Sequence, residues 1–413
     1  MTAAYHGVDA LVCRSAEEVS GSFKGLRLGS GFQPIYSLAH RRVVGYEALL
    51  RATASDGAGV SPLTVFGMAA DDAEAVFLDR LCRTVHLGNF MAAGDERSWL
   101  FLNVSPQVVV RGQDHGSFIL DLLIRNGMPA SRVVVEILEG QIDDDLRLAD
   151  TVDYYKKLGC LVAIDDFGAG HSNFDRIWKV SPHIVKFDRS MIIQAATNRT
   201  VRRVLPSLVS LIHETGSLAL MEGIETGDEA LIAMDSGFDL VQGYYFGRPG
   251  NAALSTEPGS RAIDELHERH GSQSQSEANG YRRELACYED RFRQAVDLVA
   301  SGTLLEESCA PLLDSPRAER CYLLDSNGRQ LGGNICAPAW PARTDPRFAP
   351  LADGSGAVWS RRHYFLRAVN SPGEVQTTRP YLSIAGANMC ITLSVALQLN
   401  NQFVVFCCDL DWG

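Results

Sequence analysis

The chain has few lysines and lacks any long apolar segment. Only 5 of its 38 basic residues are lysines, none of them beyond Lys186, and the formal net charge is −12. This charge argues against a surface that coats DNA or RNA, although bound divalent cations would still allow a small phosphorylated ligand. No stretch approaches the roughly 20 apolar residues of a membrane span, and the N-terminal segment lacks a signal-peptide pattern. These absences predict a cytoplasmic protein with no membrane span and no nucleic-acid partner.

The ten cysteines show no metal-type spacing. The one close pair, Cys407 and Cys408, is adjacent, which suits neither a zinc site nor an ordinary disulfide. We therefore interpret the cysteines as reduced and mostly buried. Seven of them lie after residue 280, so redox or metal sensing in that part of the chain is the alternative hypothesis.

What the sequence does contain is a series of short apolar runs that each end on a charged or amide residue. A length of 413 residues predicts two domains. Five such runs lie between residues 100 and 245, and they end at Asn103, Glu136, Asp165-Asp166, Lys186 and Glu222. One polar group at the end of a buried strand is an accident, but five in succession predict a shared mouth where the strands open.

Helix-like segments separate these runs, and each stops at a glycine. The four glycines are Gly127, Gly159, Gly216 and Gly237. Glycine just past a helix tolerates the left-handed conformation that closes the last turn. The repeat of strand, helix, glycine and strand predicts βα units with buried parallel strands. An α/β barrel is favoured because it places functional residues at the ends of several strands. A doubly wound open sheet, which concentrates its site at one switch point, is the alternative.

The composition changes after Pro249. Residues 255–280 are rich in Ser, Gly, Gln and Glu and predict a linker or a solvated helical connector, and residues 281–300 have helical spacing. Beyond Cys321, two hairpins predict a small α+β domain with an antiparallel sheet. Four arginines and one tyrosine of this domain are candidates for an anion pocket, with a plain solvated face as the alternative. They are Arg361, Arg362, Arg367, Arg379 and Tyr381.

The strand-end residues predict a metal site. Carboxylates that converge without partners repel each other, and divalent cations relieve that repulsion. Ligands that are all oxygens, including an amide oxygen, suit Mg²⁺ or Mn²⁺, and so many of them suit two ions about 3.5–4 Å apart. For Asp165 and Asp166 the alternative is one structural Asp and one helix N-cap, because neighbours on a strand face opposite sides. The flexible run Gly168-Ala169-Gly170 would let both converge. The chain strongly prefers Arg to Lys, so a Lys at this strand end indicates that a compact ammonium group is required there. An ordinary surface Lys at position 186 is the alternative.

These residues also form a known set of motifs. The pentapeptide Glu47-Ala48-Leu49-Leu50-Arg51 resembles the signature of the EAL domains, the phosphodiesterases of cyclic di-GMP. The resemblance covers residues 27–250 and follows the order of the family through Gln33-Pro34-Ile35, Asn103-Val104-Ser105-Pro106, Glu136-Ile137-Leu138-Glu139, Asp165-Asp166-Phe167-Gly168-Ala169-Gly170, Lys186-Phe187-Asp188, Glu222-Gly223-Ile224-Glu225 and Gln242-Gly243-Tyr244. Two positions depart from the family: Leu138 stands where Thr is usual, and His171 where Tyr is common.

The resemblance implies a modified TIM-type (β/α)8 barrel with one antiparallel strand, and hydrolysis of cyclic di-GMP to linear pGpG with two Mg²⁺ or Mn²⁺ ions. It implies metal ligands at Glu47, Asn103, Glu136, Asp165 and Asp166, catalytic roles for Lys186, Glu222 and Glu47, substrate contacts from Gln33, Leu50, Arg51 and Gln242, and a loop-supporting role for Glu139. His171 lies in the regulatory loop, so its departure would bear on coupling rather than on chemistry, with an ordinary loop histidine as the alternative. Glu222 is either the general base or a further metal-linked carboxylate.

The expected domains are an N-terminal extension (1–26), the EAL barrel (27–250), a helical connector (251–300) and a PAS- or Cache-like sensor domain (301–413). A homodimer and an unknown small ligand at the C-terminal domain are the further expected partners. Two alternatives to an enzyme remain: a cyclic di-GMP receptor without turnover, and a protein-interaction module.

Overall fold

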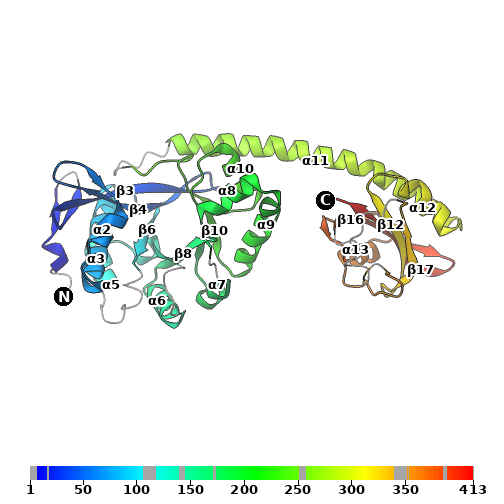
Figure 1. The fold of residues 1–413 in the computed structure, drawn as a ribbon, viewed down its shortest axis with the longest axis horizontal. Coiled ribbons are helices and arrows are strands. Elements are labelled where there is room, and N and C mark those ends of the chain that lie inside the picture. Colours follow the sequence, from blue (N-terminus) through cyan, green and yellow to red (C-terminus); the bar gives the residue numbers. More distant parts are fainter. Residues whose placement is uncertain are drawn as a thin grey trace. The chain divides into compact units, whose positions relative to one another are not determined.

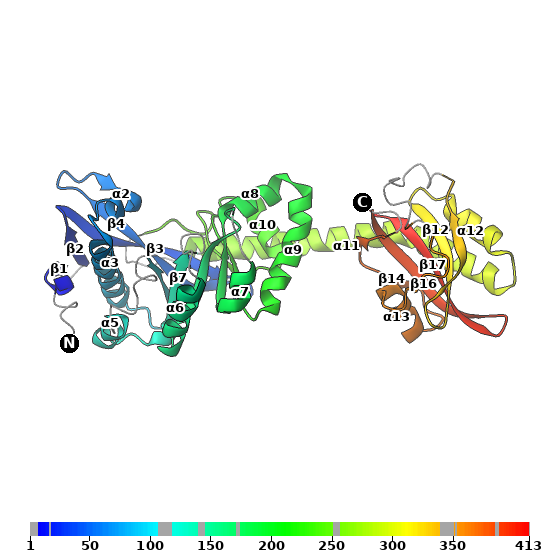
Figure 2. The same cartoon turned by 60° about the horizontal axis from the view of Figure 1, so that its bottom comes forward.

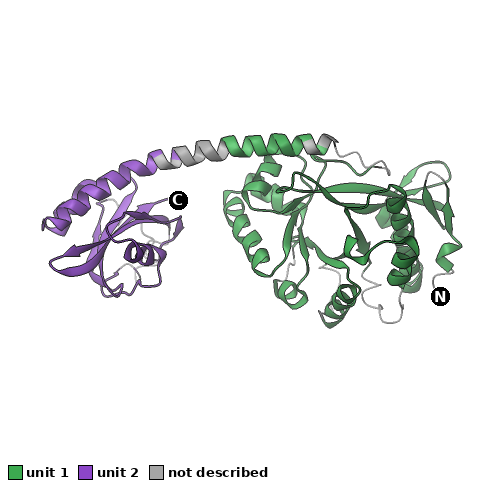
Figure 3. Ribbon diagram, turned by 180° about the vertical axis from the view of Figure 1, so that it is seen from behind, with its two compact units in different colours: residues 1–273 green, residues 274–413 purple. Residues whose placement is uncertain are grey.

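The protein consists of two compact units, residues 1–273 and residues 274–413 (Figure 3). The structure, a computed structural model, describes residues 7–15, 18–105, 118–138, 145–170, 174–250, 257–338, 351, 353–384 and 388–412. Within these ranges no helix has both the length and the apolar character that crossing a membrane requires.

The first unit is built on a closed barrel of eight strands (Figure 1). Around the ring the order is β3 (Leu26–Ser37), β11 (Leu240–Val241), β10 (Leu218–Met221), β9 (Ile184–Phe187), β8 (Leu161–Phe167), β7 (Val133–Leu138), β6 (Trp99–Val104) and β4 (Arg42–Thr53), which pairs with β3 again. Strand β3 is antiparallel to both of its neighbours, and all other pairs in the ring are parallel. The predicted modified barrel with one antiparallel strand is confirmed.

Three short strands extend this sheet outside the ring: β1 (Val12–Arg14), β2 (Val19–Phe23) and β5 (Gly59–Val60). The connections carry helices α2 (Pro62–Gly67), α3 (Asp72–Ala92), α5 (Phe118–Asn126), α6 (Asp145–Lys157), α7 (Phe174–Val180), α8 (Arg189–Thr197), α9 (Arg199–Glu214) and α10 (Gly227–Asp235), with a 3-10 turn at Ala130–Arg132. The four predicted glycine stops follow α5, α6, α9 and α10 with φ between 65° and 88°. They are confirmed as left-handed helix ends.

The interior of the barrel is an apolar layer with one residue from nearly every strand. Its members share a core cluster, and they are Ile35, Phe101, Val134, Ala163, Ile184, Leu220 and Leu240. Strand β4 contributes Gly45 at this level, where an added Cβ would lie 2.7 Å from the Phe101 ring. The glycine therefore leaves room for a large side chain from the next strand, and the layer closes the barrel floor beneath its mouth.

A single helix, α11 (Glu257–Ala300), leads from one unit into the other. Ile263 and Leu266 belong to a core cluster of the first unit, and Leu285 and Phe292 to one of the second. The predicted connector is thus helical, and its helix continues through residue 300. The domain boundaries that the sequence suggests at residues 26, 250 and 300 stay predictions.

The second unit contains an antiparallel sheet with helices on both faces (Figure 2). Its sheet order is β13 (Gln330–Cys336), β12 (Ala318–Asp325), β17 (Gln402–Asp411), β16 (Met389–Leu399) and β14 (Gln376–Thr377), with β15 (Tyr381–Leu382) also paired to β16. Helices α11 and α12 (Leu305–Leu313) share a core with one face, and α13 (His363–Asn370) with the other.

Both predicted hairpins are present in this sheet, β12–β13 and β16–β17. Gly328 in the first turn has φ 76°, and Asn400 and Asn401 in the second have φ 50° and 65°. These are left-handed values that glycine and asparagine accept most readily. The α+β prediction is confirmed, whereas the likeness to PAS or Cache domains stays a prediction.

Candidate active site

A ring of polar side chains stands above the apolar layer of the barrel. In each strand of the ring the polar residue lies two positions from the apolar one, which places both on the inner face because side chains alternate along a strand. The ring consists of Gln33, Glu47, Asn103, Glu136, Asp165, Lys186, Glu222 and Gln242. Every one of these residues was a sequence candidate, and the structure brings them to one mouth.

Lys186 lies at the centre of the ring and is fully buried. Its Nζ is 2.5 Å from Glu136 Oε1, 2.5 Å from Glu222 Oε1 and 3.2 Å from Asp165 Oδ1. Glu47 Oε2 lies 4.0 Å away. One ammonium group therefore faces four carboxylates, so the ring holds more negative than positive charge.

The charge imbalance shifts the protonation of the ring. Burial raises the pKa of Glu136 well above its ordinary value, and repulsion from neighbouring carboxylates adds to it against the attraction of Lys186. The pKa of Glu222 is raised for the same reasons, burial first. Burial by itself would lower the pKa of Lys186, but the carboxylates around it, Asp165 foremost, raise that pKa well above its ordinary value. The ring thus favours the charged form of the Lys186 ammonium and the protonated forms of Glu136 and Glu222.

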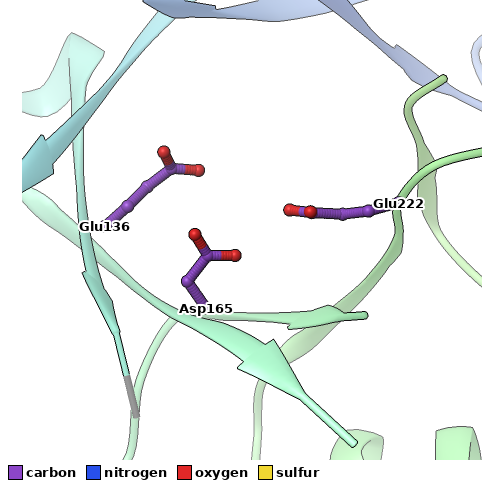
Figure 4. A group of neighbouring side chains, drawn as sticks. All are labelled: Glu136, Asp165 and Glu222. Carbon is purple, nitrogen blue, oxygen red and sulfur yellow. The ribbon is translucent and has the colours of Figure 1, made fainter. Parts of the chain in front are cut away.

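Three of the carboxylates converge on one space. Figure 4 shows Glu136 on β7, Asp165 on β8 and Glu222 just after β10 turned toward one another. One oxygen from each lies within 4.8 Å of the others. Glu222 is the most accessible of the three, with 22% of its side chain exposed. It therefore has a path to solvent that Glu136 lacks.

Two amide side chains hold Glu47 in place. Gln242 Nε2 donates to Glu47 Oε2 at 2.7 Å and to Gln33 Oε1 at 3.2 Å, and Asn103 Nδ2 donates to Glu47 Oε1 at 3.0 Å. Gln33 Nε2 in turn donates to the carbonyl of Gly247 at 3.2 Å. Both oxygens of Glu47 are therefore oriented by donors.

The Asp165-Asp166 pair departs from regular strand geometry. Asp166 has φ 60°, and the pairing of β8 with β9 shifts register between Ile164 and Phe167. The backbone therefore turns at Asp166 itself as well as in the glycine run, where Gly168 has φ 99°. For Asp166, which has a Cβ, this conformation costs roughly 1–2 kcal/mol. Burial, with repulsion from Asp165 and Asp188, raises the pKa of Asp166 to about 6. A strained carboxyl group of this kind at a mouth is typical of functional sites.

Two predicted substrate residues lie outside the ring. Leu50 is 7% exposed and belongs to the outer core, because its position in β4 has the opposite parity to Glu47. Arg51 has the same parity as Glu47 and is exposed, with its Nε over Gly31 on the neighbouring strand. The side chain of Arg51 can therefore reach a ligand above the ring, whereas the side chain of Leu50 is on the opposite face of β4. Glu139 and His171 lie outside the described residues.

Comparison with known proteins agrees with this geometry. A sequence profile of the EAL domain matches residues 16–249, more than half of the chain. The chain belongs to the EAL domain family.

Two EAL domain proteins are informative relatives. YkuI of Bacillus subtilis is 27% identical over 350 residues, which are 82% of this chain and 83% of YkuI. The crystal structure of YkuI, in complex with substrate c-di-GMP and calcium, matches with a TM-score of 0.79 at 25% identity and covers 94% of this chain and 96% of that one. The cyclic di-GMP phosphodiesterase RocR of Pseudomonas aeruginosa is 32% identical over 129 residues, 31% of this chain and 33% of RocR. The likeness to YkuI therefore extends beyond the EAL domain, and the likeness to RocR covers about a third of each protein.

The EAL barrel also contains a supporting ion pair that the sequence analysis missed. Asp79 and Arg83 on α3 form an ion pair, and each is only 3% exposed. Asp79 Oδ1 accepts from the backbone N–H of Ser105 at 2.9 Å, two residues beyond Asn103. The pair thus fixes the chain that follows Asn103. An acid and a base four residues apart in a predicted helix, where side chains at i and i+4 are neighbours, are the signal that was available.

The EAL mouth fits a divalent cation. Its carboxylate and amide donors all offer oxygen, the ligand type that hard cations prefer. Glu136 Oε2 is buried and has no hydrogen-bond partner among the described residues. Negative charge exceeds positive charge around Lys186, so a cation would lower the energy of the cluster. The closest group of donors includes Glu222, which the sequence considered as a base or a metal-linked carboxylate.

Proposed function

We propose that the protein is a metal-dependent phosphodiesterase that hydrolyses cyclic di-GMP to linear pGpG. The observation that carries the proposal is a buried ring in which one ammonium group faces four carboxylates. Such a ring has the charge to hold divalent cations, and the cations would attract a phosphodiester anion. The complex of YkuI with substrate c-di-GMP and calcium supports this choice of ligand.

The proposed cofactors are two Mg²⁺ or Mn²⁺ ions held by Glu47, Asn103, Glu136, Asp165 and Asp166. When bound, such ions lower the pKa of water and neutralise charge on the phosphoryl oxygens. The mutual bonding of Glu47 with Asn103 and Gln242 orients one side of this set. We expect the left-handed turn at Asp166, which has φ 60°, to bring a second carboxyl group to the other side.

Lys186 would stabilise negative charge during the reaction, and Glu222 would transfer the proton. The ammonium group of Lys186 is held between Glu136 and Glu222, so it reduces repulsion between an attacking hydroxide and the anionic substrate. Glu222 has a raised pKa and partial exposure, which suit a general base that exchanges its proton with solvent. Gln33 and Gln242 would bind substrate beside Glu47, and Arg51 would bind a phosphate oxygen above them.

The decisive experiment is incubation of the purified full-length protein with cyclic di-GMP and Mg²⁺ or Mn²⁺, with chromatographic detection of pGpG. We expect pGpG to form, to require the cation and to be lost in Glu222→Ala. Tight binding of cyclic di-GMP without pGpG, unchanged by Glu222→Ala, would make the protein a receptor. Absence of binding would contradict both functions. The cytoplasmic location and the homodimer stay predictions from the sequence.

A further inference from the structure

A second polar pocket lies in the C-terminal unit, on the face of the sheet that α13 covers. It is open to solvent at one side, and the space among its lining residues and at its mouth, open solvent included, is about 330 Å³. Residues from β12, β13, β15 and the segment before α13 line it, among them Arg320, Tyr322, Gln330, Trp359, Arg362 and Tyr381. Of the predicted arginine group, Arg362 and Tyr381 line the pocket, so the anion-pocket alternative stays a prediction for these two.

The floor of the pocket is a closed network of buried polar groups. Arg320 donates from Nε and Nη2 to Asp409 Oδ2 at 2.8 and 2.6 Å. The hydroxyls of Tyr322 and Thr392 donate to Asp409 Oδ1 at 3.2 and 2.7 Å. Tyr381 and Thr392 are joined through their hydroxyls at 2.6 Å. The charge of Arg320 is therefore balanced by Asp409, and the network fixes the aromatic rings that face the pocket.

Arg362 in the wall is a cation of a different kind. Its guanidinium lies 5.9 Å from the ring centroid of Trp359 and 5.7 Å from that of Tyr381. No carboxylate of the described residues lies within ion-pair distance of it. Arg362 also precedes α13, whose first turn contains no acidic residue and receives no side-chain cap from Arg362. The pocket thus carries one positive charge without a partner in that part of the chain, held between two aromatic rings.

We propose that this pocket binds a small organic monocarboxylate. The carboxylate would pair with Arg362, and its carbon body would lie against the rings of Trp359 and Tyr381. A single unbalanced guanidinium matches one negative charge, whereas a phosphate dianion would leave excess charge in an aromatic pocket. The C-terminal unit contains no lysine that would add a second cation. This inference does not depend on the proposed phosphodiesterase activity.

The test is a titration of the full-length protein with sodium acetate, pyruvate and benzoate, with inorganic phosphate for comparison, all at constant ionic strength. The readouts are the melting temperature and the tryptophan fluorescence, with Trp359→Phe to assign the fluorescence to the pocket. We expect saturable binding of at least one monocarboxylate. The affinity should fall about tenfold or more in Arg362→Gln, because a charge-assisted hydrogen bond is lost.

The matched control is Arg361→Gln, since Arg361 is exposed and does not line the pocket. It should bind the same monocarboxylate as tightly as the unaltered protein. Arg362→Lys, which keeps the charge, should retain part of the affinity and so separates loss of charge from loss of folding. Three results would each overturn the proposal: no saturable binding of any of the three carboxylates, tighter binding of phosphate, or unchanged affinity in Arg362→Gln. None of these readouts uses cyclic di-GMP, so failure here leaves the proposed function unaffected.

Discussion

Lys186 and Arg320, two of the buried basic residues of the protein, have surroundings that differ in charge balance. Lys186 in the barrel faces four carboxylates, one of which, Glu136, keeps a buried oxygen with no hydrogen-bond partner among the described residues. Arg320 in the C-terminal sheet faces one carboxylate, Asp409, to which two hydroxyls also donate. Both groups are buried, yet only the first sits in an excess of negative charge.

The difference indicates two uses of buried charge. A balanced and fully bonded pair such as Arg320–Asp409 shapes its surroundings and has no further demand for ligand. An unbalanced cluster such as the one around Lys186 is stable only with added protons or cations. The number of carboxylates around the buried basic group, rather than its burial alone, therefore distinguishes the candidate active site from the Arg320–Asp409 pair.

The largest effect is expected from Glu222→Gln. Removing a general base typically lowers turnover by about 10²–10⁴-fold, and this substitution keeps the size of the side chain. The rate of pGpG formation should fall by that range while the protein stays folded. The control is Glu214→Gln, at the exposed end of α9, which should keep full turnover. Turnover that survives Glu222→Gln would remove Glu222 from the chemistry.

Replacing a carboxylate by the amide of the same shape should change the unfolding free energy in opposite ways around Arg320 and around Lys186. Asp409→Asn leaves Arg320 buried and unpaired, which costs about 3–5 kcal/mol of unfolding free energy. Glu136→Gln removes a repulsive charge, so in the presence of a chelator the unfolding free energy should be unchanged or higher. Denaturant unfolding of both variants measures the difference. Equal destabilisation by the two substitutions would mean that the barrel cluster is balanced after all.

The sequence predicted the barrel well because its signals are local. Glycine stops such as Gly127 and Gly216 and polar strand ends such as Asn103 depend on a few neighbouring residues. The left-handed conformation of Asp166 was not predicted, because the shift in register between β8 and β9 at this point is not reported by any local pattern. The contacts of Lys186 with four strands' carboxylates likewise follow from closure of the ring rather than from spacing.

Two other features were within reach of the sequence. Strand alternation alone separates Leu50 from Glu47, since the two differ by an odd number of positions in β4. Asp79 and Arg83 are an ordinary helical pair whose importance appears only when Ser105 is seen to bond to Asp79. Local periodicity predicts which face a residue occupies, but not which distant backbone it supports.

One acid in the balanced sheet should give stability a pH dependence. Burial raises the pKa of Glu319 from 4.5 to about 7. Glu319 Oε2 and Asn388 Oδ1 are both buried without a hydrogen-bond partner among the described residues, so a proton on the carboxyl group would supply the missing donor. The associated stability, about 3 kcal/mol from the size of the shift, is fully present below pH 4.5 and is lost as the pH rises through about 7.

Glu319→Gln keeps a donor at every pH, so the variant should lack this dependence. The measurement is the unfolding free energy of the unaltered protein minus that of Glu319→Gln, at pH 5 and at pH 8. From pH 5 to pH 8 we expect the unaltered protein to lose roughly 2.5 kcal/mol of unfolding free energy relative to Glu319→Gln. A constant difference would contradict the shift.

The smallest effect is expected below the ring, at Gly45. An added Cβ would lie 2.7 Å from the Phe101 ring, and overpacking of this kind costs about 1–3 kcal/mol. Gly45→Ala should lower the unfolding free energy by that amount and reduce turnover through displacement of Glu47, two residues further along β4. The control Gly59→Ala has open space at its Cβ and should change neither. A fully active and fully stable Gly45→Ala would show that the apolar layer does not position the ring.

The most direct test of the charge-balance account is equilibrium binding of Mn²⁺, followed by electron paramagnetic resonance of the free ion. The full-length protein should bind Mn²⁺, Glu136→Gln should bind it at least about tenfold more weakly, and Asp409→Asn should bind it unchanged wherever it remains folded. Equal Mn²⁺ affinity in the unaltered protein and Glu136→Gln, or no binding at all, would contradict the claim that the barrel ring is the cation site.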